Sequence, residues 1–348
     1  MEKEYIDSLL SFYDKYRRIL PWREDPTPYH VYISEIMLQQ TRVDTVKEYY
    51  LRFISKYPDV DSVANADIDN LQLLWQGLGY YSRIMNIKKA CEKMKEIFSS
   101  SVPDRLSDLL ELPGIGDYTS KAILAISYQK KYVAVDGNLL RVFSRLTMSK
   151  ENIKDKKTKE KAEAYFMDNI PSRPGDYLQA LMDLGEMVCL PNGKPLCEKC
   201  PFASFCLAHK YKREIDFPVV IKKTKVKEEN KTVVLFLYQN DVLIHKRKDN
   251  GLLASLFEFT TIDQQFSIEE MESYCKKNGY CYEKIEKLDD QRFVFTHRIW
   301  NMTGYLVILK EKAEGSFVPV DNLSRYTIPT VFSYYSNLLK NRESRNLI

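Results

Sequence analysis

The chain has 348 residues, of which 44% are apolar and 29% are charged. At about 150 residues per domain this length suggests two domains, and the composition excludes a disordered chain. The net charge of +4 does not identify a partner, and the longest purely apolar or aromatic run, residues 233–238, is far shorter than the roughly 20 residues of a membrane-spanning helix. The N-terminus opens on charged residues without an apolar segment, so we expect no signal peptide and no membrane association.

The first 188 residues carry the hydrophobic periodicity of helices. Apolar side chains recur at helical spacing over residues 6–13 and again over residues 31–54. Further helical runs are expected at 71–75, 84–98, 121–127, 139–146 and 177–188, separated by proline and glycine. The sequence therefore predicts an all-α domain over residues 1–209.

A basic segment follows over residues 210–229, with Pro218 and few large apolar side chains. It is interpreted as a linker, either a solvated tether or a strap that contacts phosphates. Beyond it the pattern becomes that of strands, predicted at 232–238, 242–246, 257–261, 292–295 and 302–309, with a hairpin turn at 239–241 and helices at 268–277 and 331–339. This pattern indicates a smaller α+β domain over residues 230–348.

Four of the seven cysteines fall within 18 residues. They are Cys189, Cys197, Cys200 and Cys206. In a chain without a secretory signal this cluster indicates a metal site rather than disulfides. Four thiolates hold either one zinc ion or one iron-sulfur cluster, and the spacing alone leaves both open.

Two segments place glycine or aspartate just before a helical run. The segment LPGIGD, residues 112–117, contains Gly114 and Gly116 and suits a tight turn whose backbone N–H groups bind a phosphate. A plain turn between helices is the alternative. Asp136 precedes the helical run at 139, where its ordinary role is an N-cap, and there it could also face a positive centre in a cleft.

Two further segments have two interpretations each. Glu35 lies in an apolar helical stretch, so it is either buried with a raised pKa or on a solvated face, and the residues alone favour the solvated face. Tyr80 and Tyr81 stand between glycines and Arg83, where they either stack on a base or belong to the core.

Together these motifs resemble the helix-hairpin-helix DNA glycosylases with an iron-sulfur cluster, most closely the adenine DNA glycosylases of the MutY family. The matching segments are 20–23, 34–41, 75–83, 112–119, 135–141, 181–189, 251–259, 295–297 and 328–330. The resemblance implies an all-α N-terminal helix-hairpin-helix glycosylase domain with an iron-sulfur cluster loop, followed by a smaller α+β Nudix-like C-terminal domain. It also implies hydrolysis of the N-glycosidic bond of adenine mispaired with 8-oxoguanine or guanine in duplex DNA, in base excision repair.

The resemblance also assigns roles to residues. Glu35 matches the general acid, Asp136 the carboxylate that stabilises the sugar cation, and Tyr118 and Asn138 the residues beside them. The remaining matches are an adenine pocket of Trp22, Arg23 and Gln179, a DNA wedge of Gln40 and Tyr80, a phosphate-binding hairpin at Gly114 and Gly116, an 8-oxoguanine reader of Phe295, Thr296 and His297, and a [4Fe-4S] cluster on Cys189, Cys197, Cys200 and Cys206, with zinc as the alternative.

One position separates two chemistries. The related endonuclease III family has a nucleophilic lysine where this chain has Tyr118, and Lys121 stands about one helical turn further on. We therefore expect a monofunctional glycosylase without efficient strand cleavage. The competing hypotheses are a bifunctional glycosylase-lyase and a non-catalytic DNA-binding module with a structural metal.

Several positions depart from the family pattern. The first cysteine gap has seven residues instead of six, Thr296 replaces a serine, and residues 257–260 read FEFT where the family often has WEFP. The glutamate string of Nudix hydrolases is absent after Gly251, so we expect the second domain to recognise rather than hydrolyse nucleotides. The expected partner is duplex DNA with an adenine mispair, bound by a monomer in the cytoplasm of a bacterial-type cell.

Overall fold

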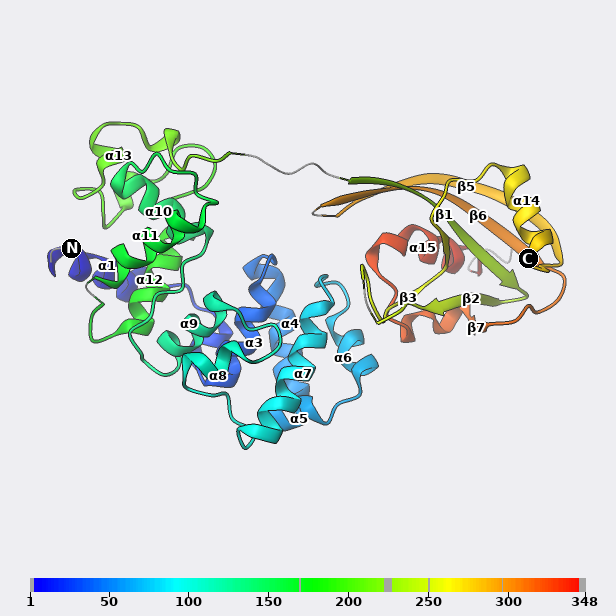
Figure 1. Ribbon diagram of the computed structural model, residues 1–348, viewed down its shortest axis with the longest axis horizontal. Helices are drawn as coiled ribbons and strands as arrows, with labels where there is room; N and C mark the ends of the chain where they lie inside the picture. Colours follow the sequence, from blue (N-terminus) through cyan, green and yellow to red (C-terminus); the bar gives the residue numbers. More distant parts are fainter. Residues whose placement is uncertain (1–2, 169, 222–226, 250, 296, 344–348) are drawn as a thin grey trace. The chain divides into compact units, whose positions relative to one another are not determined.

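The computed structural model describes residues 3–168, 170–221, 227–249, 251–295 and 297–343. Backbone contacts divide the chain into two compact units: Met1–Ala66 with Met85–Lys222, and Asp67–Ile84 with Lys223–Ile348. Helices come first along the chain and the sheet follows, so the predicted order of an all-α part and an α+β part is confirmed (Figure 1). No helix in the described part of the chain has the length and apolar character needed to cross a membrane.

The helices before the sheet follow most of the predicted runs. They are α1 (Lys3–Tyr16), α2 (Pro21–Glu24), α3 (Pro28–Leu38), α4 (Val43–Lys56), α5 (Val60–Ala64), α6 (Ile68–Trp75), α7 (Ser82–Ile97), α8 (Leu106–Leu110), α9 (Asp117–Ile126), α10 (Gly137–Thr147), α11 (Lys156–Met167), α12 (Pro174–Met187) and α13 (Leu207–Lys210), with short 3-10 helices at Cys197–Lys199 and Glu214–Asp216. The predicted run 31–54 is two helices, because the backbone turns at Gln40, whose φ is 57°. Helix α11 was not predicted. It buries only Thr158, Ala162 and Phe166, so its sequence lacks a clear apolar periodicity.

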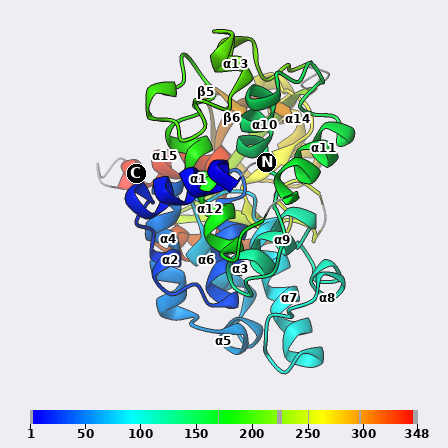
Figure 2. The ribbon, with the colours of Figure 1, turned by 90° about the vertical axis from the view of Figure 1, so that its left-hand side faces the viewer.

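Helix α9 lies at the centre of the first unit. All its residues from Thr119 to Ile126 are buried, and it packs against α3, α8 and α12. Helix α1 in turn packs against α12, although the two are far apart in the sequence (Figures 1 and 2). Since α9 is surrounded on all sides, its N-terminal end is held in a fixed position.

The second unit is built on one mixed sheet. Its strands are β1 (Lys227–Tyr238), β2 (Asp241–Lys246), β3 (Phe257–Glu258), β4 (Thr260–Ile262), β5 (Tyr282–Val294), β6 (Arg298–Leu309) and β7 (Ser316–Pro319). The order is β3-β2-β1-β6-β5, with β4 paired to β1 and β7 paired to β2. The pair β1–β6 is parallel, the other pairs are antiparallel, and Tyr238 faces Asp241 across the predicted hairpin turn.

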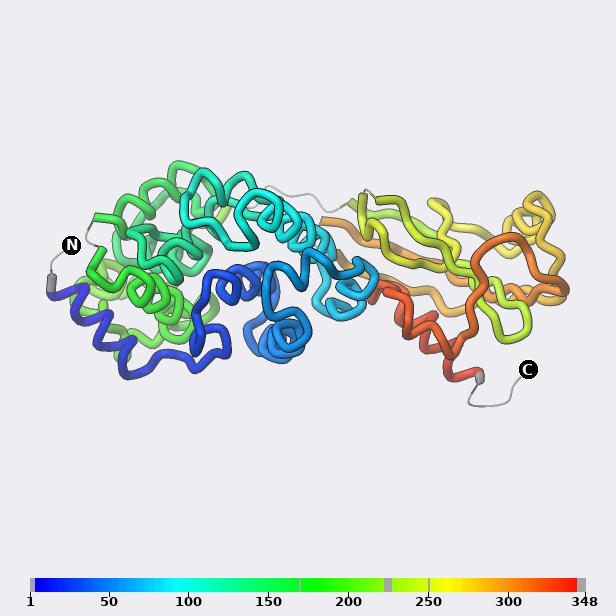
Figure 3. The backbone as a smooth tube through the Cα atoms, turned by 90° about the horizontal axis from the view of Figure 1, so that it is seen from below, coloured from blue at the N-terminus to red at the C-terminus, as the bar shows by residue number. Residues whose placement is uncertain are grey.

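Each face of the sheet packs on one helix. Val233 and Leu235 of β1 face α15 (Ser333–Glu343), whereas the alternate residues Val234 and Phe236 face α14 (Ile268–Lys277). This alternation follows from the two-residue period of a strand. In Figure 3 the yellow α14 and the red α15 accordingly lie on opposite sides of the strands.

The segment predicted as a linker is ordered over its first half. Arg145 of α10 donates from Nε to the carbonyl oxygens of Glu214 (3.0 Å) and Phe217 (3.1 Å). Val219 forms a bridge with Asn152. Residues up to 221 therefore pack on the helical unit, while residues 222–226 lie outside the described part.

The strands differ from their predictions in several places. Strands β1 and β6 begin at Lys227 and Arg298, earlier than the predicted starts at 232 and 302, and β7 was not predicted. The run at 257–261 is two short strands on either side of the buried Phe259. Strand β5 begins ten residues earlier than the predicted start at 292, at Tyr282. Its residues 282–291 are mostly charged or polar, and that composition hid the strand. Among the described residues β5 pairs with β6 alone.

Candidate active site

A cavity of about 750 Å³ opens in the first unit. Its walls come from α2, α3, α9, α12, the turn between α3 and α4, and the segment leading into α10. Pockets for small molecules measure roughly 300–1,000 Å³, so this one can receive a nucleoside. Its lining includes Glu35, Tyr118, Asp136, Asn138 and the predicted adenine-pocket residues.

Glu35 is buried, so the interpretation that placed it on a solvated face is wrong. The side chain of Thr27 caps α3 by accepting from the N–H of His30 (3.2 Å), and α3 then packs between α4 and α9. Glu35 is left 7% exposed, at the cavity wall. Burial raises the pKa of Glu35 to about 7, a hydrogen bond from Tyr118 opposes this rise, and the Asp136 charge adds to it.

Asp136 is the N-cap that its position predicted, and its side chain also lies at the cavity. Its carboxylate accepts from the Leu139 N–H of α10 at 2.8 Å. Burial raises the pKa of Asp136, while hydrogen bonds from the Leu139 and Asn138 backbone oppose the rise. The side-chain oxygen of Asn138 accepts from Arg141 Nη2 (2.9 Å), and the same nitrogen donates to the Gly185 carbonyl (2.7 Å). The start of α10 is thereby anchored to α12.

Tyr118 reaches the cavity from the first turn of α9, behind the predicted hairpin. Gly114 has φ +78°, and a Cβ there would lie 2.7 Å from the Asn86 Cβ, so only glycine fits. Gly116 is the N-cap of α9 and has an ordinary φ of −100°. The hairpin is thus a tight turn that fixes where Tyr118 emerges.

Lys121 is held away from this cavity. It is 8% exposed, and its ammonium group pairs with Asp117 (2.7 Å) and Glu163 (2.6 Å). Within the described part of the chain, no lysine is among the residues that line the cavity.

The predicted adenine-pocket residues all line the cavity. Trp22 and Gln179 are buried. Arg23 Nη1 and Nη2 donate to the two carboxylate oxygens of Asp183 at 2.7 and 3.0 Å. Arg18 Nε donates to the same fully buried carboxylate at 2.6 Å. Asp183 and Arg18 were not predicted from the sequence. The one signal for Asp183 is an acidic residue within the mostly apolar run 178–184.

The predicted wedge residues lie in different units. Gln40 is exposed at the rim of the cavity. Tyr80, in the second unit, is 45% exposed with φ +48°, whereas Tyr81 is buried in the core. Arg83 Nη2 donates to the carbonyls of Leu78 (3.0 Å) and Gly79 (3.1 Å), which stabilises the turn that presents Tyr80.

The predicted 8-oxoguanine reader occupies the β5–β6 turn. Phe295 is half-buried and His297 is exposed. Thr296 lies outside the described residues.

The four clustered cysteines line one small cavity of the helical unit. Arg145 lies in the same lining and donates from Nη1 to Cys189 Sγ at 3.2 Å. Four sulfurs around one space, beside a guanidinium that offsets negative charge, fit a group ligated by four thiolates. The other three cysteines lie outside this lining: Cys91 and Cys275 are buried elsewhere, and Cys281 is exposed.

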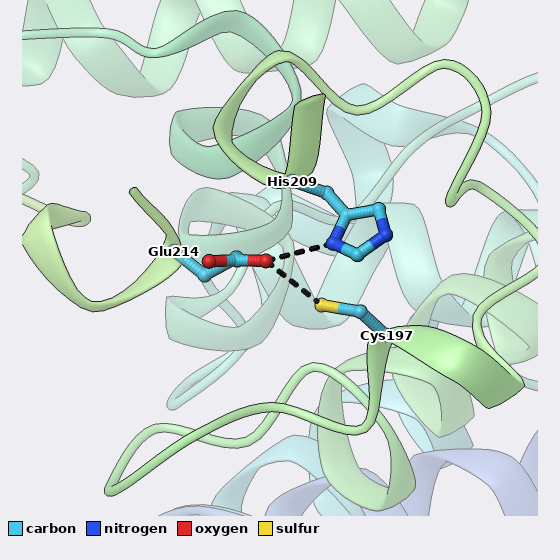
Figure 4. Close-up of side chains that lie close together, drawn as sticks. All are labelled: Cys197, His209 and Glu214. Atoms are coloured by element: carbon cyan, nitrogen blue, oxygen red, sulfur yellow. Dashed lines mark hydrogen bonds and ion pairs between the residues drawn. The ribbon is translucent and has the colours of Figure 1, made fainter. Parts of the chain in front are cut away.

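His209 and Glu214 line the same cavity and were not predicted. His209 Nδ1 lies 2.7 Å and Cys197 Sγ 3.6 Å from the Glu214 carboxylate (Figure 4). Their possible ligand atoms lie within 4.8 Å of one another. The region therefore holds sulfur, nitrogen and oxygen donors, and nothing in this geometry decides between iron-sulfur and zinc.

Comparisons with known proteins agree with this architecture. Residues 33–168 match the HhH-GPD superfamily of base excision DNA repair proteins, and residues 232–337 match the NUDIX domain. The adenine DNA glycosylase of Buchnera aphidicola subsp. Schizaphis graminum is 35% identical over 293 residues, which span 84% of this chain and 82% of that protein. The adenine DNA glycosylase of Buchnera aphidicola subsp. Baizongia pistaciae is 33% identical over 313 residues, 87% of this chain and 84% of that protein.

Among solved structures, a thermostable thymine-DNA glycosylase superposes with a TM-score of 0.54. It is 28% identical, and the match covers 60% of this chain and 98% of that one. Both domain types expected from the sequence are confirmed.

Proposed function

This chain belongs to the adenine DNA glycosylase family, and from that premise we propose that Glu35 and Asp136 together cleave the bond between adenine and deoxyribose. Its activity is that of an adenine DNA glycosylase in base excision repair. This proposal rests on one observation: Glu35, Asp136 and Tyr118 all line the same cavity.

Adenine must first leave the base stack, because a paired nucleotide hides its glycosidic bond. In the cavity Glu35, with a pKa of about 7, donates its proton to the N7 atom of adenine. Departure of the neutral base leaves positive charge on the sugar, which the Asp136 carboxylate stabilises. A water molecule then adds to the sugar carbon, and the proton that it loses restores the acid form of Glu35.

The neighbouring side chains orient these two groups. Tyr118 hydrogen-bonds Glu35 and so directs its carboxyl group. Arg23, fixed by Asp183, and the buried Gln179 supply polar groups for the edge of the purine. Trp22 packs edge-on against Tyr50 at 5.4 Å and forms part of the wall.

The other predicted residues recognise the base opposite adenine and contact the surrounding DNA. Phe295, Thr296 and His297 read 8-oxoguanine, and Gln40 and Tyr80 fill the gap that adenine leaves. Exposure of His297, Gln40 and Tyr80 supports this assignment, since a residue that contacts DNA must be accessible. The turn at Gly114 and Gly116 contributes backbone N–H groups to a phosphate.

Cys189, Cys197, Cys200 and Cys206 hold a [4Fe-4S] cluster, with zinc as the alternative. Bound there, the group would supply structure rather than chemistry to the reaction, because it would join Cys189, just after α12, to the loop that carries the other three cysteines. Cleavage of the DNA strand is not part of the activity, since Lys121, which follows Tyr118 by three residues in α9, is paired with Asp117 and Glu163. The substrate is thus duplex DNA with adenine opposite 8-oxoguanine or guanine.

The test uses the full-length protein and duplexes with adenine opposite 8-oxoguanine, guanine or thymine, sampled with and without alkali to reveal abasic sites. Glu35→Gln and Asp136→Asn should bind the mispaired duplex but lose excision, by about 10²–10⁴-fold for Glu35→Gln. Glu96→Gln, an exposed glutamate of α7, is the matched control and should behave as the native protein. Intact adenine in every duplex would refute the enzyme and favour a DNA-binding module.

A further inference from the structure

The first residues of β1 contact the β5–β6 turn. Phe295 donates its N–H to the Arg298 carbonyl (2.8 Å), which closes the turn. The backbone N–H of Lys227, the first residue of β1, donates to the His297 carbonyl at 3.2 Å. Strand β1 then runs parallel to β6, with Glu229 in register with Trp300. The first residues of β1 therefore lie directly beside the turn.

The Glu229 carboxylate links the start of β1 to the start of β6. Its Oε1 accepts from Arg298 Nη1 and pairs with Lys227 Nζ, both at 2.9 Å. Its Oε2 accepts from Trp300 Nε1 at 3.0 Å and faces Lys231 Nζ at 3.4 Å. The side chain is 12% exposed, and both oxygens are engaged. The lysine and tryptophan partners lower the pKa of Glu229 to about 2, so it stays ionised at neutral pH.

Trp300 connects Glu229 to the turn. It is 2% exposed, and its ring meets Phe295 edge-on at 5.1 Å. Phe295 in turn contacts Phe293 of β5 at 4.9 Å. Lys231 lies 4.9 Å from the centre of the Trp300 ring. Because the Nε1 hydrogen bond fixes the rotation of the indole, the surface on which Phe295 rests is fixed as well.

We propose that Glu229 is a positioning residue for recognition of 8-oxoguanine, holding Arg298 and Trp300 so that Phe295 and His297 keep their positions. This inference rests on the proposed role of residues 295–297 as the reader of the oxidised guanine. Glu229 itself does not contact the base. It acts through the ion pair to Arg298 and through the ring of Trp300.

The readout is the ratio of single-turnover excision rates for adenine opposite 8-oxoguanine and opposite guanine. A loss of folding lowers both rates and leaves their ratio, whereas misplacing the turn lowers the ratio. Glu229→Ala removes all four contacts and should reduce the ratio about tenfold. Glu229→Gln keeps an acceptor for Trp300 and should retain part of the preference.

Two further variants separate positioning from stability. Trp300→Phe keeps the ring but lacks Nε1–H, so it should lower the ratio even if Glu229→Ala folds poorly. Glu228→Gln is the matched control: Glu228 is exposed, adjoins Glu229 and accepts a long hydrogen bond from Asn301 Nδ2 at 3.4 Å. Its ratio should equal that of the native protein.

The possible failures are distinguishable. If the native protein shows no preference for 8-oxoguanine, the proposed role of residues 295–297 fails before any variant is compared. If the native preference is present but unchanged in both Glu229→Ala and Trp300→Phe, the positioning role of Glu229 is overturned while the proposed function stands.

Discussion

Glu35 and Asp136 are positioned by different helices, α3 and α10, yet the Asp136 charge adds to the rise that burial causes in the pKa of Glu35. Their surroundings differ in a way that separates their roles. Glu35 is buried in a helix interior and meets one phenol, whereas Asp136 receives hydrogen bonds from the Leu139 and Asn138 backbone. Glu35 therefore keeps its proton near neutral pH, whereas the ionised form of Asp136 is stabilised by more hydrogen-bond donors.

The first prediction concerns the pH dependence of excision. Glu35 must be protonated to donate, so the single-turnover rate should fall as pH rises through about 7, by up to tenfold per pH unit above it. The rate should also fall in acid, where Asp136 gains a proton at a pH above its ordinary range. Rates measured between about pH 5 and pH 9 check both limbs. A rate that stays constant above neutral pH would exclude Glu35 as the proton donor.

The second prediction concerns stability. The folded protein holds the Glu35 proton more tightly than the unfolded chain, so the stability of the native protein should decrease as pH rises from 4.5 through about 7. Glu35→Gln has no such proton and should be more stable than the native protein at alkaline pH, by at most about 3 kcal/mol. Urea unfolding at about pH 5 and pH 8.5 measures the difference. Equal pH dependence in both proteins would mean that Glu35 is not buried.

Most of the scaffold could be predicted because its causes are local. Helix α14 was predicted with its observed bounds, since Ser267 and Glu270 form a capping box before an amphipathic run. The cysteines that line one cavity were likewise evident from their spacing. These features need only a few neighbouring residues.

The burial of Glu35 and Asp183 could not be predicted in the same way. Glu35 is covered because α9 packs on α3, and Asp183 because α1 and α2 bring Arg18 and Arg23 to α12. In both cases the covering residues come from distant parts of the chain. An acid within an apolar run looks the same in sequence whether such cover exists or not.

The third prediction concerns Asp183, whose carboxylate holds Arg18 and Arg23. In Asp183→Asn the Arg23 charge is no longer compensated. Arg23 already lowers the pKa of Glu35, so the stronger field should lower it further and move the alkaline limb of excision to lower pH. The pH profile of the variant checks this shift, with Glu96→Gln as the control. A shift toward higher pH would show that Arg23 does not act on Glu35.

The fourth prediction concerns strand cleavage. Formation of an imine with the abasic sugar requires a free amine within reach, and Lys121 is buried in pairs with Asp117 and Glu163. Borohydride should therefore trap little protein on DNA, and Lys121→Ala should leave that amount unchanged. Tyr118→Lys places an amine on the cavity wall and should increase trapping. Strong trapping of the native protein that disappears in Lys121→Ala would establish a bifunctional enzyme.

The fifth prediction compares the two glycines of the hairpin. Gly114→Ala places a Cβ 2.7 Å from the Asn86 Cβ at φ +78°, a conformation that alanine disfavours by about 1–2 kcal/mol before any clash is counted. The free energy of unfolding should therefore fall by at least about 1–2 kcal/mol. Gly116→Ala meets no atom within 4 Å and has φ −100°, so it should keep native stability. If Gly116→Ala nevertheless loses affinity for duplex DNA, the added methyl group blocks the approach of a phosphate. Equal stability of the two variants would contradict the tight turn that positions Tyr118.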